Sequence, residues 1–210
     1  MLELPAIPIH LADLEQAGTV TNFLSIIIAA ALANNVVLVQ FLGVSSLFAY
    51  SDRLQSAIEV ALLSFFVLFV AALINLLLFR FLLAPLNLEY LKLLCFVSIS
   101  SGISGLSIHW IKQRFPLSLR RQKLAFYLIG GNSAVIGVAL INTVSGLGIV
   151  ESAAYSLGAA LGFALLLIAF AALRQRLDTT EVPTPFRGAA IHLVSAGIIA
   201  MCFLGFAGPV

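Results

Sequence analysis

Two otherwise apolar stretches of the sequence carry side chains that could do chemistry. One reads LANNVVLVQFLGVSS and contains Asn34 and Asn35; the other reads LIGGNSAVIGVALIN and contains Gly130, Gly131 and Asn132. An amide without a partner in hydrocarbon costs several kcal/mol, so these side chains must face protein or a cavity. The glycine pair permits a helix break and a close approach of backbone.

Two interpretations of these polar residues remain open. The functional one is a polar site near the middle of a membrane, built from both stretches. The structural one is interhelical hydrogen bonding with small-residue packing, which is common in membrane bundles. The recurrence of asparagine in both stretches raises the weight of the functional interpretation.

The composition indicates that a membrane surrounds these stretches. Apolar residues make up 61% of the 210 and charged residues only 10%, and the mean hydropathy is +1.12. A soluble fold needs polar residues to cover its outside, whereas lipid removes that need. Because the apolar runs are long and continuous, they favour membrane helices over a barrel. Nothing suggests a nucleic-acid partner, and the sequence contains no phosphate loop, dinucleotide fingerprint or zinc spacing.

Six apolar segments have about the length that one helix needs to cross a bilayer. The sequence therefore predicts an all-α integral membrane protein with six transmembrane helices. Their approximate bounds are Thr21–Gly43, Ala57–Phe79, Tyr90–Trp110, Leu124–Val144, Ser152–Leu173 and Gly188–Ala207.

The basic residues predict how these helices are oriented. Of the 11 Lys and Arg, all but Arg80 and Lys92 fall in the connectors on one side of the predicted membrane. The positive-inside tendency makes that side cytoplasmic, which places both termini in the periplasm. The predicted organisation is a periplasmic segment 1–20, a first unit 21–110, a basic cytoplasmic connector 111–123 and a second unit 124–210.

Short matches between the two units predict an internal repeat. They recur in the same order, about a hundred residues apart. Because three spans is an odd number, the two units must have opposite orientations, and such inverted repeats often carry a site near the midplane. The matches include Leu54-Gln55-Ser56-Ala57 with Val150-Glu151-Ser152-Ala153, Val97-Ser98 with Val194-Ser195, and Asn34-Asn35 with Asn132.

Three stretches together resemble the Rnf/Nqr membrane-subunit family, in particular its RnfA/NqrE-type branch. They read ANNVVLVQFLGVS, GGNSAVIGVALIN and EVPTPFRGAAIHLVSAGIIAMCFLGFAG, and the resemblance runs from about residue 20 to the end. It implies six helices in inverted three-helix repeats, in the bacterial inner membrane. It also implies a non-catalytic subunit of a complex that exchanges electrons between NADH and ferredoxin or quinone, coupled to Na⁺ or H⁺ movement.

The implied partners are other subunits that carry flavin and iron–sulfur groups, together with a homologous six-helix membrane subunit. In the family, two such six-helix subunits supply four cysteines to one 2Fe–2S cluster. Here Ser45 and Ser133 occupy the two cysteine positions of this chain. Iron–sulfur clusters favour thiolate sulfur over a hydroxyl, so the resemblance argues against an ordinary cluster. Cys95 and Cys202 do not match the ligand positions and are expected to be structural.

Two further residues and two alternative functions complete the predictions. Arg187 belongs to the connector before the last span, where it is expected to contact a partner subunit or lipid headgroups. His192, inside that span, is interpreted as a neutral hydrogen-bonded histidine, with a proton-relay role as the alternative. The serine pair leaves open a stand-alone secondary transporter, or a purely structural membrane subunit, on the same scaffold.

Overall fold

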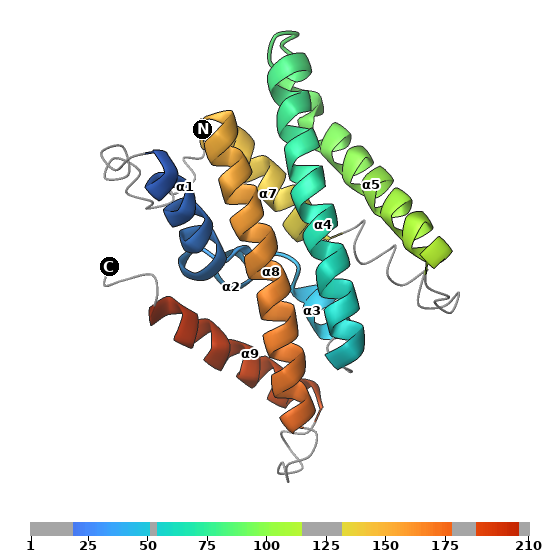
Figure 1. Ribbon diagram of the computed structural model, residues 1–210, viewed down its shortest axis with the longest axis vertical. Coiled ribbons are helices and arrows are strands. Elements are labelled where there is room, and N and C mark those ends of the chain that lie inside the picture. Colours follow the sequence, from blue (N-terminus) through green and yellow to red (C-terminus); the bar gives the residue numbers. More distant parts are fainter. Residues whose placement is uncertain (1–18, 51–53, 115–131, 178–187, 206–210) are drawn as a thin grey trace.

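The chain is helical throughout the part that its structure describes. The computed structural model describes residues 19–50, 54–114, 132–177 and 188–205, and within these ranges it contains helices and turns without a strand. Figure 1 shows two long helices, α4 and α8, side by side along the centre of the molecule, with the other elements around them. The predicted all-α class is confirmed.

The predicted first span is not one continuous helix. Its pieces are α1 (Thr19–Ile28), a π-helical segment η2 (Ala29–Ala33), α2 (Val36–Gln40) and α3 (Val44–Tyr50). The interruption between α2 and α3 contains Phe41 and Gly43, whose φ angles are 55° and 80°. A left-handed residue ends a helix because the next peptide turns away from its axis.

The next two predicted spans agree with helices in the structure. They are α4 (Leu54–Leu78) with a π-helical extension η3 (Phe79–Leu83), and a 3-10 turn η4 (Glu89–Leu91) that leads into α5 (Lys92–Arg114). Neither long helix contains proline, so the ladder of backbone hydrogen bonds can run their full length.

The described part of the second half of the chain contains three more helices. They are α7 (Ser133–Val144), α8 (Ile149–Leu177) and α9 (Ala189–Leu204). They correspond to the last three predicted spans, except that the first part of the fourth span lies outside the described residues. The N-terminal segment 1–18 and most of the predicted basic connector also lie outside them.

Small residues allow α4 and α8 to pack closely along the centre of the molecule. Ala61 and Ala71 of α4, and Ala159 and Ala160 of α8, are each at most 1% exposed, and they belong to one core cluster with Phe163. Close helix contacts in membranes depend on such residues, because lipid supplies no hydrophobic drive between helices. In Figure 1 the chain rises through α4 and descends through α8, so the two helices are antiparallel.

The helices have the dimensions and surfaces of a membrane protein. Among the described residues, three helices are long and apolar enough to span a bilayer, namely Ala57–Leu83, Glu89–Ser107 and Ile149–Leu177, and three shorter apolar helices accompany them. Large apolar side chains such as Leu62, Phe81 and Leu106 are more than 60% exposed. An apolar exterior of this extent suits lipid, because water would penalise it.

Candidate functional site

The first polar stretch forms a helix break whose two ends are joined by Asn35. Asn35 has an extended backbone, and its Oδ1 accepts a hydrogen bond of 3.0 Å from the N–H of Val37, which caps α2. Its Nδ2 donates to the carbonyl of Ala31, before the break, at 2.9 Å. The side chain is 1% exposed. One buried amide thus satisfies backbone groups on both sides of an interruption that lipid could not solvate.

The second polar stretch begins α7 with the same geometry. Asn132 has φ −68° and ψ 115°, against −63° and 120° at Asn35. Its Oδ1 accepts from the N–H of Ala134 at 3.0 Å, and the residue is 2% exposed. No partner for its Nδ2 occurs in the described part of the chain. A buried donor without an acceptor is costly, so this amide needs a partner beyond the described residues.

The break in the first stretch and the start of α7 meet at Gly43. Its N–H donates to Oγ of Ser133 at 2.9 Å. A Cβ built on Gly43 would lie 2.8 Å from Oδ1 of Asn132 and 2.7 Å from Phe163. Two features therefore require glycine at position 43: its positive φ of 80°, and the close approach of Asn132 and Phe163 to its Cα. Residues ninety positions apart in the chain form one junction as a result.

Two glycines of α8 allow the first break to lie against this helix. A Cβ on Gly158 would come within 2.5 Å of the carbonyl oxygen of Ile27. A Cβ on Gly162 would come within 2.6 Å of the Ala31 carbonyl and 2.8 Å of Nδ2 of Asn35. The spacing of four residues puts both glycines on one face of α8. Their missing side chains create the space that the broken helix occupies.

The two serines of the predicted ligand positions lie beside the junction. Ser45 is in the first turn of α3, two residues after Gly43, and Ser133 begins α7. Both serines have exposed side chains. Ser133 directly follows Asn132 in the chain, and both serines lie on the outside of the described residues.

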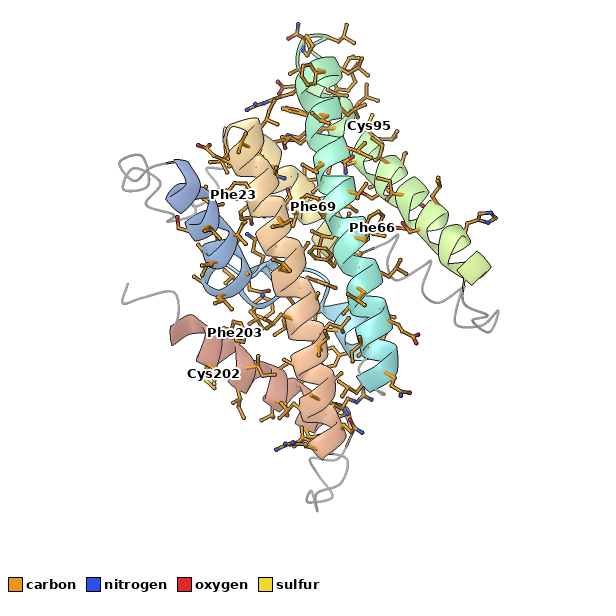
Figure 2. The ribbon with its side chains drawn as sticks, viewed as in Figure 1. Phe23, Phe66, Phe69, Cys95, Cys202 and Phe203 are labelled. Carbon is orange, nitrogen blue, oxygen red and sulfur yellow. The ribbon has the colours of Figure 1, made fainter. Side chains whose placement is uncertain are left out.

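The cysteines are far from this junction and from each other. Figure 2 shows Cys95 on α5 and Cys202 on α9, on opposite sides of the α4–α8 pair. Within the described ranges, no group of three or more His, Cys, Asp and Glu side chains gathers in a way that could hold a metal ion.

Two further buried asparagines connect neighbouring helices. Nδ2 of Asn75 on α4 donates to Oγ of Ser100 on α5 at 3.3 Å. Nδ2 of Asn142 on α7 donates to Oγ of Ser156 on α8 at 2.7 Å. Sequence analysis did not single out either pair. Both fit the structural use of polar residues in membrane bundles, whereas Asn35 and Asn132 differ because they cap the N-termini of α2 and α7.

Known proteins are similar in sequence to nearly the whole chain. Residues 23–210 match the family described as "Rnf-Nqr subunit, membrane protein". The chain belongs to the Rnf-Nqr family of membrane subunits. It is 42% identical over 192 residues to the A subunit of the ion-translocating oxidoreductase complex of Alkalilimnicola ehrlichii, covering 90% of this chain and 98% of that protein. The protein of the same name from Azotobacter vinelandii is 41% identical over 189 residues, covering 90% and 97%.

In this Rnf-Nqr subunit, the oxygen donors do not fit an iron–sulfur cluster. Oγ of Ser133 already accepts the N–H of Gly43, and the junction offers hydroxyls and amides where a cluster needs thiolates. Gly130, Gly131 and Arg187, also predicted to be functional, lie outside the described residues. Sequence analysis missed Gly158 and Gly162, because a glycine inside an apolar helix carries no signal of what it will touch.

Proposed function

We propose that this chain is the A-type membrane subunit of an ion-translocating oxidoreductase complex in the bacterial inner membrane. The observation that carries the proposal is a family match over residues 23–210 that includes both asparagine-capped breaks. Two relatives with that name align with 90% of this chain. On this proposal, the flavin and iron–sulfur chemistry resides on other subunits, and a homologous six-helix subunit is the neighbour in the membrane.

The proposed architecture is six spans in two inverted three-helix repeats, with both termini in the periplasm. The matching caps at Asn35 and Asn132 support equivalent positions in the two repeats. The chain directions in Figure 1 support the inversion, since α4 and α8 are antiparallel, and α5 descends while α9 ascends. Inverted repeats of this kind place discontinuous helices at the centre of the membrane.

C-terminal reporter fusions test the proposed orientation. A fusion of alkaline phosphatase after Val210 should be active, because that enzyme folds in the periplasm, and the matched fusion of green fluorescent protein should be dark. The proposed orientation follows from the Lys and Arg distribution. Bright fluorescence with inactive phosphatase would overturn it, although the six spans and the junction would stand.

The proposed functional centre is the junction of the two broken helices, with Asn35 and Asn132 at its core and Asn34 beside them. Its amide and backbone oxygens suit a small cation or a chain of waters, because such oxygens replace hydration without net charge. The Nδ2 of Asn132 supports the chain of waters, since it is a donor for which the described residues supply no acceptor.

The proposed subunit differs from its family in lacking the usual cluster ligands. Replacing Ser45 and Ser133 together by cysteine should add iron to the purified complex, provided that the neighbouring subunit supplies its own two cysteines. Thiolates would then replace hydroxyls that iron–sulfur clusters disfavour. Iron per complex, measured by elemental analysis, should rise by about two atoms, the content of one 2Fe–2S cluster. The Cys95→Ser variant is the matched control for a change of cysteine number. If the neighbouring subunit carries its two cysteines and the iron content is still unchanged, then Ser45 and Ser133 do not occupy the family's cysteine positions.

Affinity purification from native membranes tests the function itself. The tagged chain is extracted in mild detergent, and accompanying proteins are identified by mass spectrometry, with iron counted on the same sample. Recovery of flavin and iron–sulfur subunits supports the proposal. Recovery of the chain alone would favour the second candidate, a stand-alone transporter on the same scaffold, for which the Ser45 and Ser133 substitutions are the specific observation.

A further inference from the structure

Three buried oxygen atoms that lack partners lie where α7 leads into α8. They are Oδ1 of Asn142, Oγ of Ser145 and Oγ of Ser152, and none has a hydrogen-bond partner among the described residues. Asn142 is 2% exposed and Ser152 is 0% exposed. Buried polar atoms in folded proteins are nearly always paired, either with protein or with ordered water. These three oxygens therefore need a partner that the side chains around them do not supply.

The pairing of α7 with α8 brings the three oxygens to one place. A short connection joins the helices, and Figure 1 shows α7 leading into the upper end of α8. Nδ2 of Asn142 donates to Oγ of Ser156 at 2.7 Å, so these two residues lie at the same level of the hairpin. Ser145 is three residues further along α7, and Ser152 is four residues back along α8. Both serines therefore lie about one turn beyond the Asn142–Ser156 pair, on the same faces of the two helices.

The hydrogen bonds already present determine which atom of Asn142 remains without a partner. The one hydroxyl proton of Ser156 is donated to the carbonyl of Ser152 at 2.7 Å. Oγ of Ser156 can therefore only accept, and the atom of Asn142 that meets it must be Nδ2. The amide oxygen is left to face the space between the helices. The pocket thus offers one acceptor and two hydroxyls, each of which can donate or accept.

We propose that one ordered water molecule binds Asn142 Oδ1, Ser145 Oγ and Ser152 Oγ. The water donates to the amide oxygen and to one hydroxyl, and it accepts from the other hydroxyl, so each of the three oxygens gains a partner. Three hydrogen bonds are the typical number for a buried water in a protein. An anion would find no donor at the amide oxygen, and a hard cation takes about six oxygen ligands, more than the three in this pocket.

The bound water fastens the end of α7 to the start of α8. α7 begins at the Asn132 cap, and α8 carries Gly158 and Gly162, against which the first break lies. The register between these two helices therefore determines how the parts of the junction meet. The proposal concerns the packing of this hairpin, so it stands or falls separately from membership of a redox complex.

The sign of a stability change tests whether water is bound. If it is, Ser152→Ala removes one of its three partners, and the temperature at which half of the monodisperse protein is lost should fall by about 2–4 °C. If the pocket is dry, the same substitution removes a buried hydroxyl that lacks a partner, so this temperature should rise. A rise, or no change, would overturn the proposal.

Ser104→Ala is the matched control for this substitution. Ser104 is also 0% exposed within a helix, but its Oγ already donates to the carbonyl of Ser100 at 2.8 Å. That carbonyl is part of the backbone ladder, and a serine bonded in this way adds little to helix stability. The temperature of half loss should therefore change by less than about 1 °C. An equal fall in both variants would show that any buried serine behaves alike, and would count against the water.

A double substitution tests whether Ser145 and Ser152 share one water. Ser145→Ala alone should also lower the temperature of half loss. Once either serine has been replaced, the water is weakly held, so the second substitution has less to remove. The double variant should therefore lose less than the sum of the two single losses. Additive losses would mean that the two hydroxyls have separate partners, which would refute the shared site.

The unmodified protein, purified with its accompanying subunits, distinguishes water from a cation. A density map that resolves waters should show one peak about 2.7–3.2 Å from all three oxygens. A peak at about 2.4 Å would mean a cation, and an empty pocket would mean no ligand. The temperature of half loss should be the same in NaCl and in choline chloride, or should differ equally for the native chain and Ser152→Ala. A rise in NaCl that Ser152→Ala abolishes would refute the water, because only a cation bound at this pocket explains it.

Discussion

Replacing Gly162 with valine should leave little folded protein in the membrane. The new Cβ would lie 2.6 Å from the carbonyl oxygen of Ala31 and 2.8 Å from Nδ2 of Asn35. The first of these atoms is backbone, so the broken helix would have to move away from α8. That movement separates Asn35 from the groups that it caps. Overpacking costs about 1–3 kcal/mol, and each buried polar group left unsatisfied costs about 1–3 kcal/mol more.

Thermal inactivation of a fluorescent fusion measures this loss. The temperature at which half of the monodisperse protein is lost on size-exclusion chromatography should fall by roughly 10 °C, since one kcal/mol corresponds to about 2–4 °C for a chain of this size. Gly102→Val is the matched control, because Gly102 is an exposed glycine of α5 whose Cβ would meet nothing within 4 Å. Similar losses for both variants would mean that helix propensity, and not the close approach, explains the effect.

Replacing Asn35 or Asn132 by leucine should abolish most of the activity while a substantial part of the protein still inserts. Each substitution removes the Oδ1 that accepts a backbone N–H at 3.0 Å. Loss of such a cap costs about 1–2 kcal/mol. The backbone N–H that loses its acceptor cannot form a hydrogen bond with water inside the membrane. The starts of α2 and α7 should then fray at the point where the two breaks meet. Activity per inserted chain should fall about tenfold, the factor that corresponds to roughly 1.4 kcal/mol.

A series of substitutions separates capping from packing. Asn132→Ser keeps an oxygen that can cap α7 and should retain more activity than Asn132→Leu. Asn75→Leu removes a buried amide of the same kind from the interior of α4 and should affect activity far less. Asn34→Leu should fall between these cases, because Asn34 is only half-buried at the same break. Normal activity with both Asn35 and Asn132 changed would exclude the junction as the functional centre.

The sequence was a good guide to the class of structure, but it did not predict the interruption of the first span. Long apolar runs predicted α4, α5, α8 and α9, because lipid tolerates little besides uninterrupted helix. The asparagines in such runs were expected to face protein or a cavity, since an amide there needs a partner, and Asn35 and Asn132 are both buried. The sequence could not tell whether Asn34 or Asn35 would be the cap, because that choice depends on how the π-helical segment Ala29–Ala33 rotates the chain.

The contacts across the junction could not be predicted from the sequence. The hydrogen bond from Gly43 to Ser133 joins residues from different halves of the chain. Nothing local at either residue specifies the other. In the same way, Gly158 and Gly162 are indistinguishable by type from Gly102 and Gly197, which meet nothing. Gly158 and Gly162 differ from the other two because backbone carbonyls of α1 and η2 lie against them. That contact is a property of the assembled fold.

The most direct test of the proposed function is ion transport by membrane vesicles from a strain that lacks this chain. Electron transfer between NADH and ferredoxin or quinone is started in everted vesicles, while Na⁺ uptake and membrane potential are recorded. If the chain is a subunit of the ion-translocating oxidoreductase, the deletion should abolish the ion movement that depends on this electron transfer. The native chain supplied in trans should restore it. Undiminished ion movement in the deletion vesicles would contradict membership of that complex.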